Sequence, residues 1–337
     1  MSTGLLHWIC LALLCVASLP ATAQAPQADE KERITAEVAH ALWWGDFQAL
    51  SRLHDQYSQP GQLQADGWPK LGLVRSGIDR AFRSPQEHVD AFYGQLQALT
   101  LQWAREHPRS GLAHALHAEA LLDHAWAIRG TGFANTVPPQ AWADFERLLR
   151  QAQAYLARHA DAAQGSTLTH SKLLTFAMVG NWSERQLWAV IDDGLRRNPH
   201  DLDLYRHGLD AVLPKWGGDA AAVDRFIRRA VERTRDARGL SMYASLYSSA
   251  AHAQFEHRLF EESGASWAEM AQGWRDLLAR HPAASSENRF AYFACLARDK
   301  TVFLELLDRI GEKPSLDQWG KNARRTFDTC KRWAGQL

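Results

Sequence analysis

Residues 141–160 have the sequence AWADFERLLRQAQAYLARHA, and this stretch decides the fold class. Its apolar side chains recur every three or four residues and therefore share one face of a helix: Trp142, Phe145, Leu148, Leu149, Ala152 and Leu156. The same spacing recurs from about residue 32 onward, whereas the period-two alternation of strands is almost absent. The sequence therefore predicts an all-α protein.

The way this helix ends also recurs along the chain. Its last residues, Ala157-Arg158-His159-Ala160, resemble four other basic helix ends: Arg105-Glu106-His107-Pro108, Arg197-Asn198-Pro199, Arg235-Asp236-Ala237-Arg238 and Arg280-His281-Pro282. Successive ends are separated by roughly 40 to 50 residues, the period of helix-pair repeats. Because one helix pair cannot bury its apolar face alone, such pairs stack into a solenoid. The sequence favours a helix-pair solenoid over the alternative, an irregular helical bundle.

The N-terminal segment is typical of an export signal. An apolar run from Leu5 to Leu19 contains no charged residue, and at about 15 residues it is shorter than the roughly 20 needed to cross a membrane. Ala21-Thr22-Ala23 follows, with small residues at alternate positions. We therefore predict a signal peptide over residues 1–23, cleaved after Ala23. Cleavage after Ala25 is an alternative, and the absence of Lys or Arg before the apolar run leaves an uncleaved segment as another.

The rest of the chain is predicted to form one domain. Residues 24–34 are predicted to be a short linker, and residues 35–335 a helical-repeat domain. Segments that carry Gly and Pro interrupt the repeats as loop insertions near 59–80, 130–139 and 214–218. In solenoids such insertions often lie on the binding face.

The charge balance argues against two classes of partner. The chain has 38 Lys and Arg against 38 Asp and Glu, so its formal net charge is zero. A nucleic-acid binder needs a basic face, and so does a protein that docks on anionic lipid. We therefore predict no nucleic-acid partner and no stable membrane insertion after signal cleavage. The Arg-rich and Ala-rich composition is typical of bacterial proteins, and together with the signal it predicts a periplasmic or secreted protein.

Two cysteines remain once the signal is removed. Cys295 and Cys330 lie on predicted helices that are separated by one further helix. In a solenoid such helices are packed neighbours, so the two thiols can meet. An oxidising compartment favours a Cys295–Cys330 disulfide, and two buried reduced thiols are the alternative.

No catalytic or metal motif is present in the sequence. GxSxG, Walker A and GxGxxG motifs are absent. His114, His117 and His124 lie on one helix, but His124 is about 10 Å along the axis from His117, too far for one zinc ion. We therefore predict no metal, no cofactor and no enzymatic activity.

Two segments combine an aromatic side chain, a cation and glycines at the end of a predicted helix. They supply the candidate binding residues, which are Trp126, Arg129, Gly130 and Gly132 in the first and Trp216, Gly217 and Gly218 in the second. Glycine lets a ligand approach the backbone closely, and Arg can hold a carboxylate with two hydrogen bonds. We predict an anion or peptide site at these loop edges. The alternative is structural: Arg129 caps its helix and pairs with Asp144 or Glu146, and each Trp packs against the next helix.

These motifs resemble those of an uncharacterised family of bacterial helical-repeat proteins, classed as a domain of unknown function. The resemblance covers about residues 35 to 335 and rests on these segments: AWxxRGxGxA (Ala125 to Ala134) with Val137, Trp142 and Phe145; Gly45-Asp46-Phe47; Trp216 to Gly218; Asn288 to Ala291; Ile310-Gly311; Trp319; and Cys330-x-x-Trp333-Ala334. It implies a tetratricopeptide-like fold and supplies no established catalytic residue.

The sequence as a whole therefore predicts a periplasmic or secreted helical-repeat protein that binds another protein or a peptide. A small-ligand or glycan-binding module is the alternative. A cell-wall enzyme, in which exposed Trp side chains stack on sugars, is less favoured because no acid pair can be identified.

Overall fold

All regular structure in the described residues is helical, which confirms the predicted all-α class. The computed structural model describes residues 25–83, 87–130 and 136–336. Within these ranges, one isolated bridge between Leu63 and Pro69 is the only strand-like pairing. The predicted signal peptide and Gly132 lie outside the described residues.

The helices of the first part of the chain have the following bounds: α1 Ala25–Trp43, α2 Phe47–Tyr57, α3 Leu71–Phe82, α4 Val89–Glu106, α5 Gly111–Arg129, α6 Pro139–Arg158, α7 Ala160–Ala163, α8 Thr167–Gly180, α9 Glu184–Arg197 and α10 Asp203–Asp210. The second part begins with the 3₁₀ turn η2 and contains η2 Pro214–Trp216, α11 Ala220–Arg238, α12 Ser241–Ala250, η3 Ala251–Phe255, η4 Glu256–Arg258, α13 Leu259–Glu262, α14 Trp267–Arg280, α15 Ala284–Leu296, α16 Lys300–Ile310, η5 Leu316–Gln318 and α17 Ala323–Ala334.

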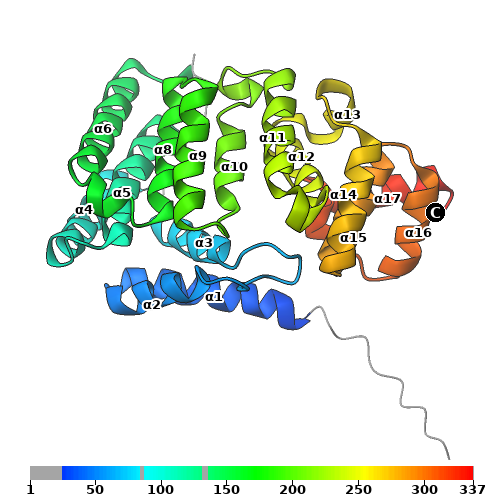
Figure 1. Cartoon of the computed structure of the whole chain (residues 1–337), viewed down its shortest axis with the longest axis horizontal. Coiled ribbons are helices and arrows are strands. Elements are labelled where there is room, and N and C mark those ends of the chain that lie inside the picture. The colour runs from blue at the N-terminus through cyan, green and yellow to red at the C-terminus, as the bar shows by residue number, and fades with distance from the viewer. Residues whose placement is uncertain (1–24, 84–86, 131–135, 337) are drawn as a thin grey trace, which may run out of the picture.

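Most helices stand beside one another in a row along the long axis of the molecule (Figure 1). The row begins at α4, α5 and α6 and ends at α16 and α17, close to the C-terminus. Helices α1 and α2 run crosswise beneath the first half of the row, and α3 lies between them and the row. The N-terminal helices thus form a separate layer against one side of the array.

The crosswise layer begins earlier than the sequence predicted. Of the linker predicted over 24–34, residues 25–34 belong to α1, which starts at Ala25, and residue 24 lies outside the described residues. Ile34 is fully buried, and the carboxylate of Glu30 accepts a hydrogen bond from Lys70 Nζ at 2.7 Å. The prediction was wrong because the buried Ile34 and the contact of Glu30 with Lys70 hold this segment as a helix within the layer.

The loop insertion predicted near 59–80 is shorter than expected, because α3 begins at Leu71. Gly77 lies inside this helix, where a Cβ atom would come within 2.6 Å of the Cβ of Val38 in α1. The glycine therefore allows two helices to pack closely and does not mark a turn. The remaining loop, residues 59–70, is called the divider loop below.

Helix α5 is the central helix of the first half of the row. It packs against α4, α6 and α8, and its sequence is apolar on every side. A helix of this kind is enclosed by neighbouring elements, and the polar side chains His114, His117 and Glu119 are buried in it as well. His114 and His117 lie in this core and contact the hydroxyls of Tyr155 and Thr100 at 2.8 and 3.1 Å.

The two cysteines lie on α15 and α17 at the far end of the row. The structure joins Cys295 to Cys330 by a disulfide, with Cα atoms 5.8 Å apart. Helix α16 lies between them in the sequence, so the bond links helices n and n+2. It closes a loop with a sequence separation of 35 residues.

Candidate functional site

The two predicted loop edges meet in space. The rings of Trp126 and Trp216 pack edge to face, with centroids 5.7 Å apart. The guanidinium of Arg129 lies 5.3 Å from the Trp126 ring centroid and 5.0 Å from that of Trp142. Asp144 and Glu146 are the two carboxylates that the sequence suggested as partners of Arg129. In the structure Asp144 pairs with Arg147, and Glu146 pairs with Arg150.

The glycines of these edges play two different roles. Gly130 and Gly217 have φ angles of +73° and +91°, a region that favours glycine, and a Cβ atom on either would meet nothing within 4 Å. Gly218 is required for close packing, because a Cβ atom there would lie 1.9 Å from the carbonyl oxygen of Val212. The side chains predicted to bind a ligand, Trp126, Arg129 and Trp216, pack against neighbouring rings, which cover much of their surface.

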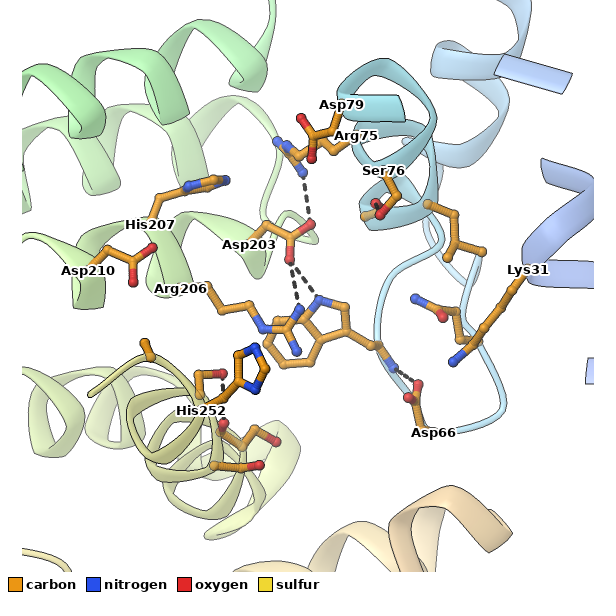
Figure 2. Close-up of a pocket in the computed structure, with 18 of the residues that line it drawn as sticks. Lys31, Asp66, Arg75, Ser76, Asp79, Asp203, Arg206, His207, Asp210 and His252 are labelled. Carbon is orange, nitrogen blue, oxygen red and sulfur yellow. Dashed lines mark hydrogen bonds and ion pairs between the residues drawn. The ribbon is translucent and has the colours of Figure 1, made fainter. Parts of the chain in front are cut away.

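A larger site, which the sequence analysis missed, lies between the crosswise layer and the row. It is a cleft with a volume of about 660 Å³, called the polar cleft below. Its walls come from α1, the divider loop and α3 on one side, and from α5, α8, α10, α12, α14 and α15 on the other. Figure 2 shows charged residues of α3 and α10 facing one another across it.

Helix α10 supplies a polar stripe to this cleft. Asp203, Arg206, His207 and Asp210 all line the cleft, and their spacing of three and four residues places them on one face. The opposite face carries the buried side chains of Leu204 and Leu209. This short helix is therefore held by the apolar core and presents its charges to the cleft.

Arg75 of α3 anchors the crosswise layer to the row. Its guanidinium donates to Asp201 at 2.9 Å and to Asp203 at 3.1 Å, and all three side chains are buried. Trp68 of the divider loop donates from Nε1 to the other oxygen of Asp203 at 2.8 Å. Burial favours a raised pKa for Asp203, but the charges of Arg75 and Arg206 outweigh it and hold that pKa below its ordinary value.

Next to this anchor, three carboxylates share one ammonium group. Lys172 of α8 is hydrogen-bonded to Glu119 of α5; Asp79 acts on both groups electrostatically, and Asp123 acts on Lys172. Burial and the neighbouring carboxylates raise the pKa of Glu119 and raise that of Asp123 well above its ordinary value. The group of Asp79, Glu119, Asp123 and Lys172, called the acid cluster below, has more negative than positive charge when its carboxylates are ionised.

Four buried polar atoms of residues that line the cleft have no hydrogen-bond partner among the described residues: Arg75 Nε, Glu119 Oε2, Trp274 Nε1 and Ser285 Oγ. Glu119 is only 1 % exposed, so its second oxygen is an acceptor withdrawn from solvent and left unmatched by the protein. Buried polar atoms are normally satisfied, because an unpaired one costs about 1–3 kcal/mol. These atoms leave unused hydrogen-bonding capacity on the cleft wall for a polar ligand or for water.

No family model, curated protein or solved structure matches the chain. The resemblance to the bacterial helical-repeat family therefore stays a prediction. No helix in the described part of the chain is long and apolar enough to cross a membrane. The same residues contain no group of three or more His, Cys, Asp or Glu side chains placed to hold a metal ion.

Two sequence signals point to the polar cleft in hindsight. One is the stripe of four polar residues in α10 at spacings of three and four. The other is Glu119, an acid inside the otherwise apolar run of α5. Arg75 gave no such signal, because its partners Asp201 and Asp203 lie more than 120 residues away in the sequence.

Proposed function

We propose that this chain is an exported, tetratricopeptide-like helix-pair solenoid that binds a peptide segment in its polar cleft. The solenoid is supported by consecutive helices that pack in pairs, including α4 with α5, α8 with α9, α11 with α12 and α15 with α16. Solenoids of this kind present extended binding surfaces built from several repeats. The lining of the cleft, which runs from α1 to α15, fits an elongated ligand better than a compact one.

The unpaired oxygen of Glu119 is the observation that carries the proposal. In the acid cluster one ammonium faces three carboxylates, so a second cation would offset part of the surplus negative charge when these carboxylates are ionised. We assign this place to a Lys or Arg side chain, or to the N-terminal amine, of the bound peptide. At the other end of the cleft, the guanidinium of Arg289 on α15 is available to an anionic group of the same peptide.

Selection of random heptapeptides on the mature protein tests the proposal. We expect the selected peptides to share a Lys or Arg residue, and a synthetic peptide of that sequence to bind at least tenfold more weakly to Glu119→Gln. Glu146→Gln is the matched control, because Glu146 lies on the exposed surface of α6 and its ion pair is with Arg150 of the same helix. Equal affinity for wild type and Glu119→Gln, or failure to select any peptide, would contradict the proposal.

A small amine-bearing ligand is the second candidate. The volume of about 660 Å³ supports it, because small-molecule sites typically measure about 300–1,000 Å³. Melting curves in the presence of glucosamine and of glucose separate this case, since only the amino sugar offers a cation to the acid cluster. Stabilisation by glucosamine alone, lost in Glu119→Gln, would favour the small ligand over the peptide.

The proposal of export rests on the N-terminal sequence and on the cysteines. A disulfide between Cys295 and Cys330 persists in an oxidising compartment, such as the periplasm, and is rare in the cytosol. Mass spectrometry of the protein from its native host tests export. A mature chain that begins after Ala23 is expected, and an intact N-terminus in the cytoplasmic fraction would contradict it.

A further inference from the structure

A second cavity lies on the other side of the divider loop. Its volume is about 510 Å³, and we call it the basic pocket. The divider loop separates the two sites: Gln64, Asp66 and Trp68 line the polar cleft, whereas Leu63 and Pro69 line the basic pocket. The basic pocket shares almost no lining with the cleft, so it needs its own explanation.

The walls of the basic pocket are the recurring basic helix ends of the sequence. Pro199 follows α9, Arg238 ends α11, and Arg280 and His281 end α14. Three successive copies of the motif thus converge on one cavity. The repeat that identified the helix pairs in the sequence also concentrates positive charge at one place.

None of the residues that line the basic pocket is an Asp or a Glu. Arg233 lines it and is paired with Asp192, which lies outside the lining. In the described part of the chain no ion pair includes Arg238 or Arg280. Arg238 donates to the carbonyl oxygen of Gly67 at 3.1 Å, and Arg280 to that of Asp276 at 2.9 Å.

These two hydrogen bonds leave most of the N–H groups of both guanidinium groups for another acceptor, because each group has five. Burial and the charge of Arg280 lower the pKa of Arg238, which shows that the protein does not compensate this cation. An uncompensated, partly buried guanidinium is costly unless an anion pairs with it. A carboxylate that bridges Arg238 and Arg280 would remove this cost.

The remaining wall of the pocket is apolar. Leu195, Leu202, Tyr205 and Leu277 line it together with Leu63 and Pro69 of the divider loop. An inorganic anion gains no binding free energy from such a surface. A molecule with an apolar body gains about 25 cal/mol for each Å² of apolar surface that it buries there. The charge and the apolar wall together define the class of ligand.

We propose that the basic pocket binds a small organic carboxylate with an apolar body, whose carboxylate is held by Arg238 and Arg280. A medium-chain fatty acid and the apolar C-terminal residue of a peptide share this chemistry. In either case the apolar part lies against the leucines of the wall and the divider loop. This site is independent of the peptide proposed for the polar cleft.

Titration calorimetry of the full mature protein tests the proposal with four probes. Octanoate represents the fatty acid and N-acetyl-leucine the C-terminal residue. Octanol has the apolar body without the charge, and acetate has the charge without the body. We expect one or both of the first two to bind, and octanol and acetate to bind at least tenfold more weakly. No binding of either apolar carboxylate, or equal binding of octanol, would overturn the proposal.

Three variants locate the bound carboxylate. Arg280→Gln and Arg238→Gln should each weaken binding of the apolar carboxylate at least fivefold. Arg235→Gln on α11 is the matched control, since Arg235 does not line the pocket, and it should leave affinity unchanged. Arg280 is exposed, so its variant reports on binding even if loss of Arg238 loosens the divider loop. Unchanged affinity in Arg280→Gln, or an equal loss in Arg235→Gln, would overturn the assignment.

Discussion

The polar cleft and the basic pocket lie on opposite sides of one short loop, and they handle charge in opposite ways. In the cleft, the charge of Arg75 is paired with Asp201 and Asp203, and carboxylates are in surplus around Lys172. In the pocket, Arg238 and Arg280 face no carboxylate. A buried charge therefore does not by itself mark a binding site. A buried charge that the protein leaves without a partner of opposite charge does.

The largest effect is expected from breaking the compensated anchor of the cleft. Arg75→Ala removes the cation between Asp201 and Asp203. The buried carboxylate of Asp201 then loses its ion pair, whereas Asp203 keeps the longer pair with Arg206 at 3.6 Å and the hydrogen bond from Trp68. We expect a loss of about 3–5 kcal/mol in the free energy of unfolding, measured by urea denaturation at pH 7.

Arg80→Ala is the matched control for this prediction. Arg80 lies on the same helix, and its ion pair with Glu32 is exposed on both sides. Such a pair is worth about 0–1 kcal/mol. If the free energy of unfolding fell by less than about 1 kcal/mol in both variants, Arg75 would not anchor the crosswise layer. The proposed difference between the paired charge in the cleft and the unpaired charges in the basic pocket would then be wrong.

The disulfide is expected to have the next largest effect, and to act on one cavity only. Ser285, Ser286 and Arg289 of α15 line the cleft, and no residue of α15 lines the pocket. Removing the Cys295–Cys330 bond by Cys→Ser substitution at both positions should lower the free energy of unfolding by about 3–4 kcal/mol, because the loop it closes becomes free in the unfolded chain.

Binding measurements test whether loss of the disulfide affects the cleft and not the basic pocket. The peptide selected for the cleft should bind more weakly to the double variant, whereas octanoate should bind the basic pocket as before. Alkylation of denatured, unreduced protein checks the bond itself. Two reactive thiols in the wild-type chain would refute it.

The pH dependence of stability is the third prediction. Burial, together with the charges of Arg75 and Lys172, lowers the pKa of His207 in the cleft to about 4. In the unfolded chain this histidine titrates near pH 6.5, so the unfolded state binds more protons between pH 6.5 and 4. Stability from neutral His207 is therefore complete above about pH 6.5 and is lost as the pH falls through 4.

We expect the free energy of unfolding to fall less between pH 7 and pH 4.5 in His207→Gln than in the wild type, by about 2–3 kcal/mol. Urea midpoints measured at the two pH values check this difference. His200→Gln is the control, because His200 lines the basic pocket and does not line the cleft. An unchanged pH profile in His207→Gln would show that His207 is not held neutral by the cleft. The raised pKa values of the acid cluster act in the opposite direction, since they favour the folded state at lower pH.

The sequence predicted what depends on neighbours along a helix. Apolar spacing indicated the helices, and the position of Cys295 and Cys330 two helices apart indicated that they could meet. It did not predict the cleft, because Arg75, Asp201 and Trp68 come together only after the crosswise layer packs on the row. The glycines of α3 were also misleading, since glycine serves close helix packing as well as turns, and the sequence pattern alone does not separate the two.

The smallest effect is expected at the loop edges, which belong to neither cavity. The Arg129 guanidinium lies over the rings of Trp126 and Trp142, and each such contact at a partly exposed site is worth about 0.5–1 kcal/mol. Arg129→Ala should therefore lower the free energy of unfolding by about 1–2 kcal/mol and leave binding of the selected peptide and of octanoate unchanged.

Arg150→Ala is the control, since its exposed pair with Glu146 contributes about 0–1 kcal/mol. A loss of about 3 kcal/mol or more would mean that Arg129 locks the fold through a buried charge. A loss of peptide capture with an unchanged melting temperature would instead move the peptide from the cleft to the loop edges, because only a residue in contact with the ligand has that pair of effects.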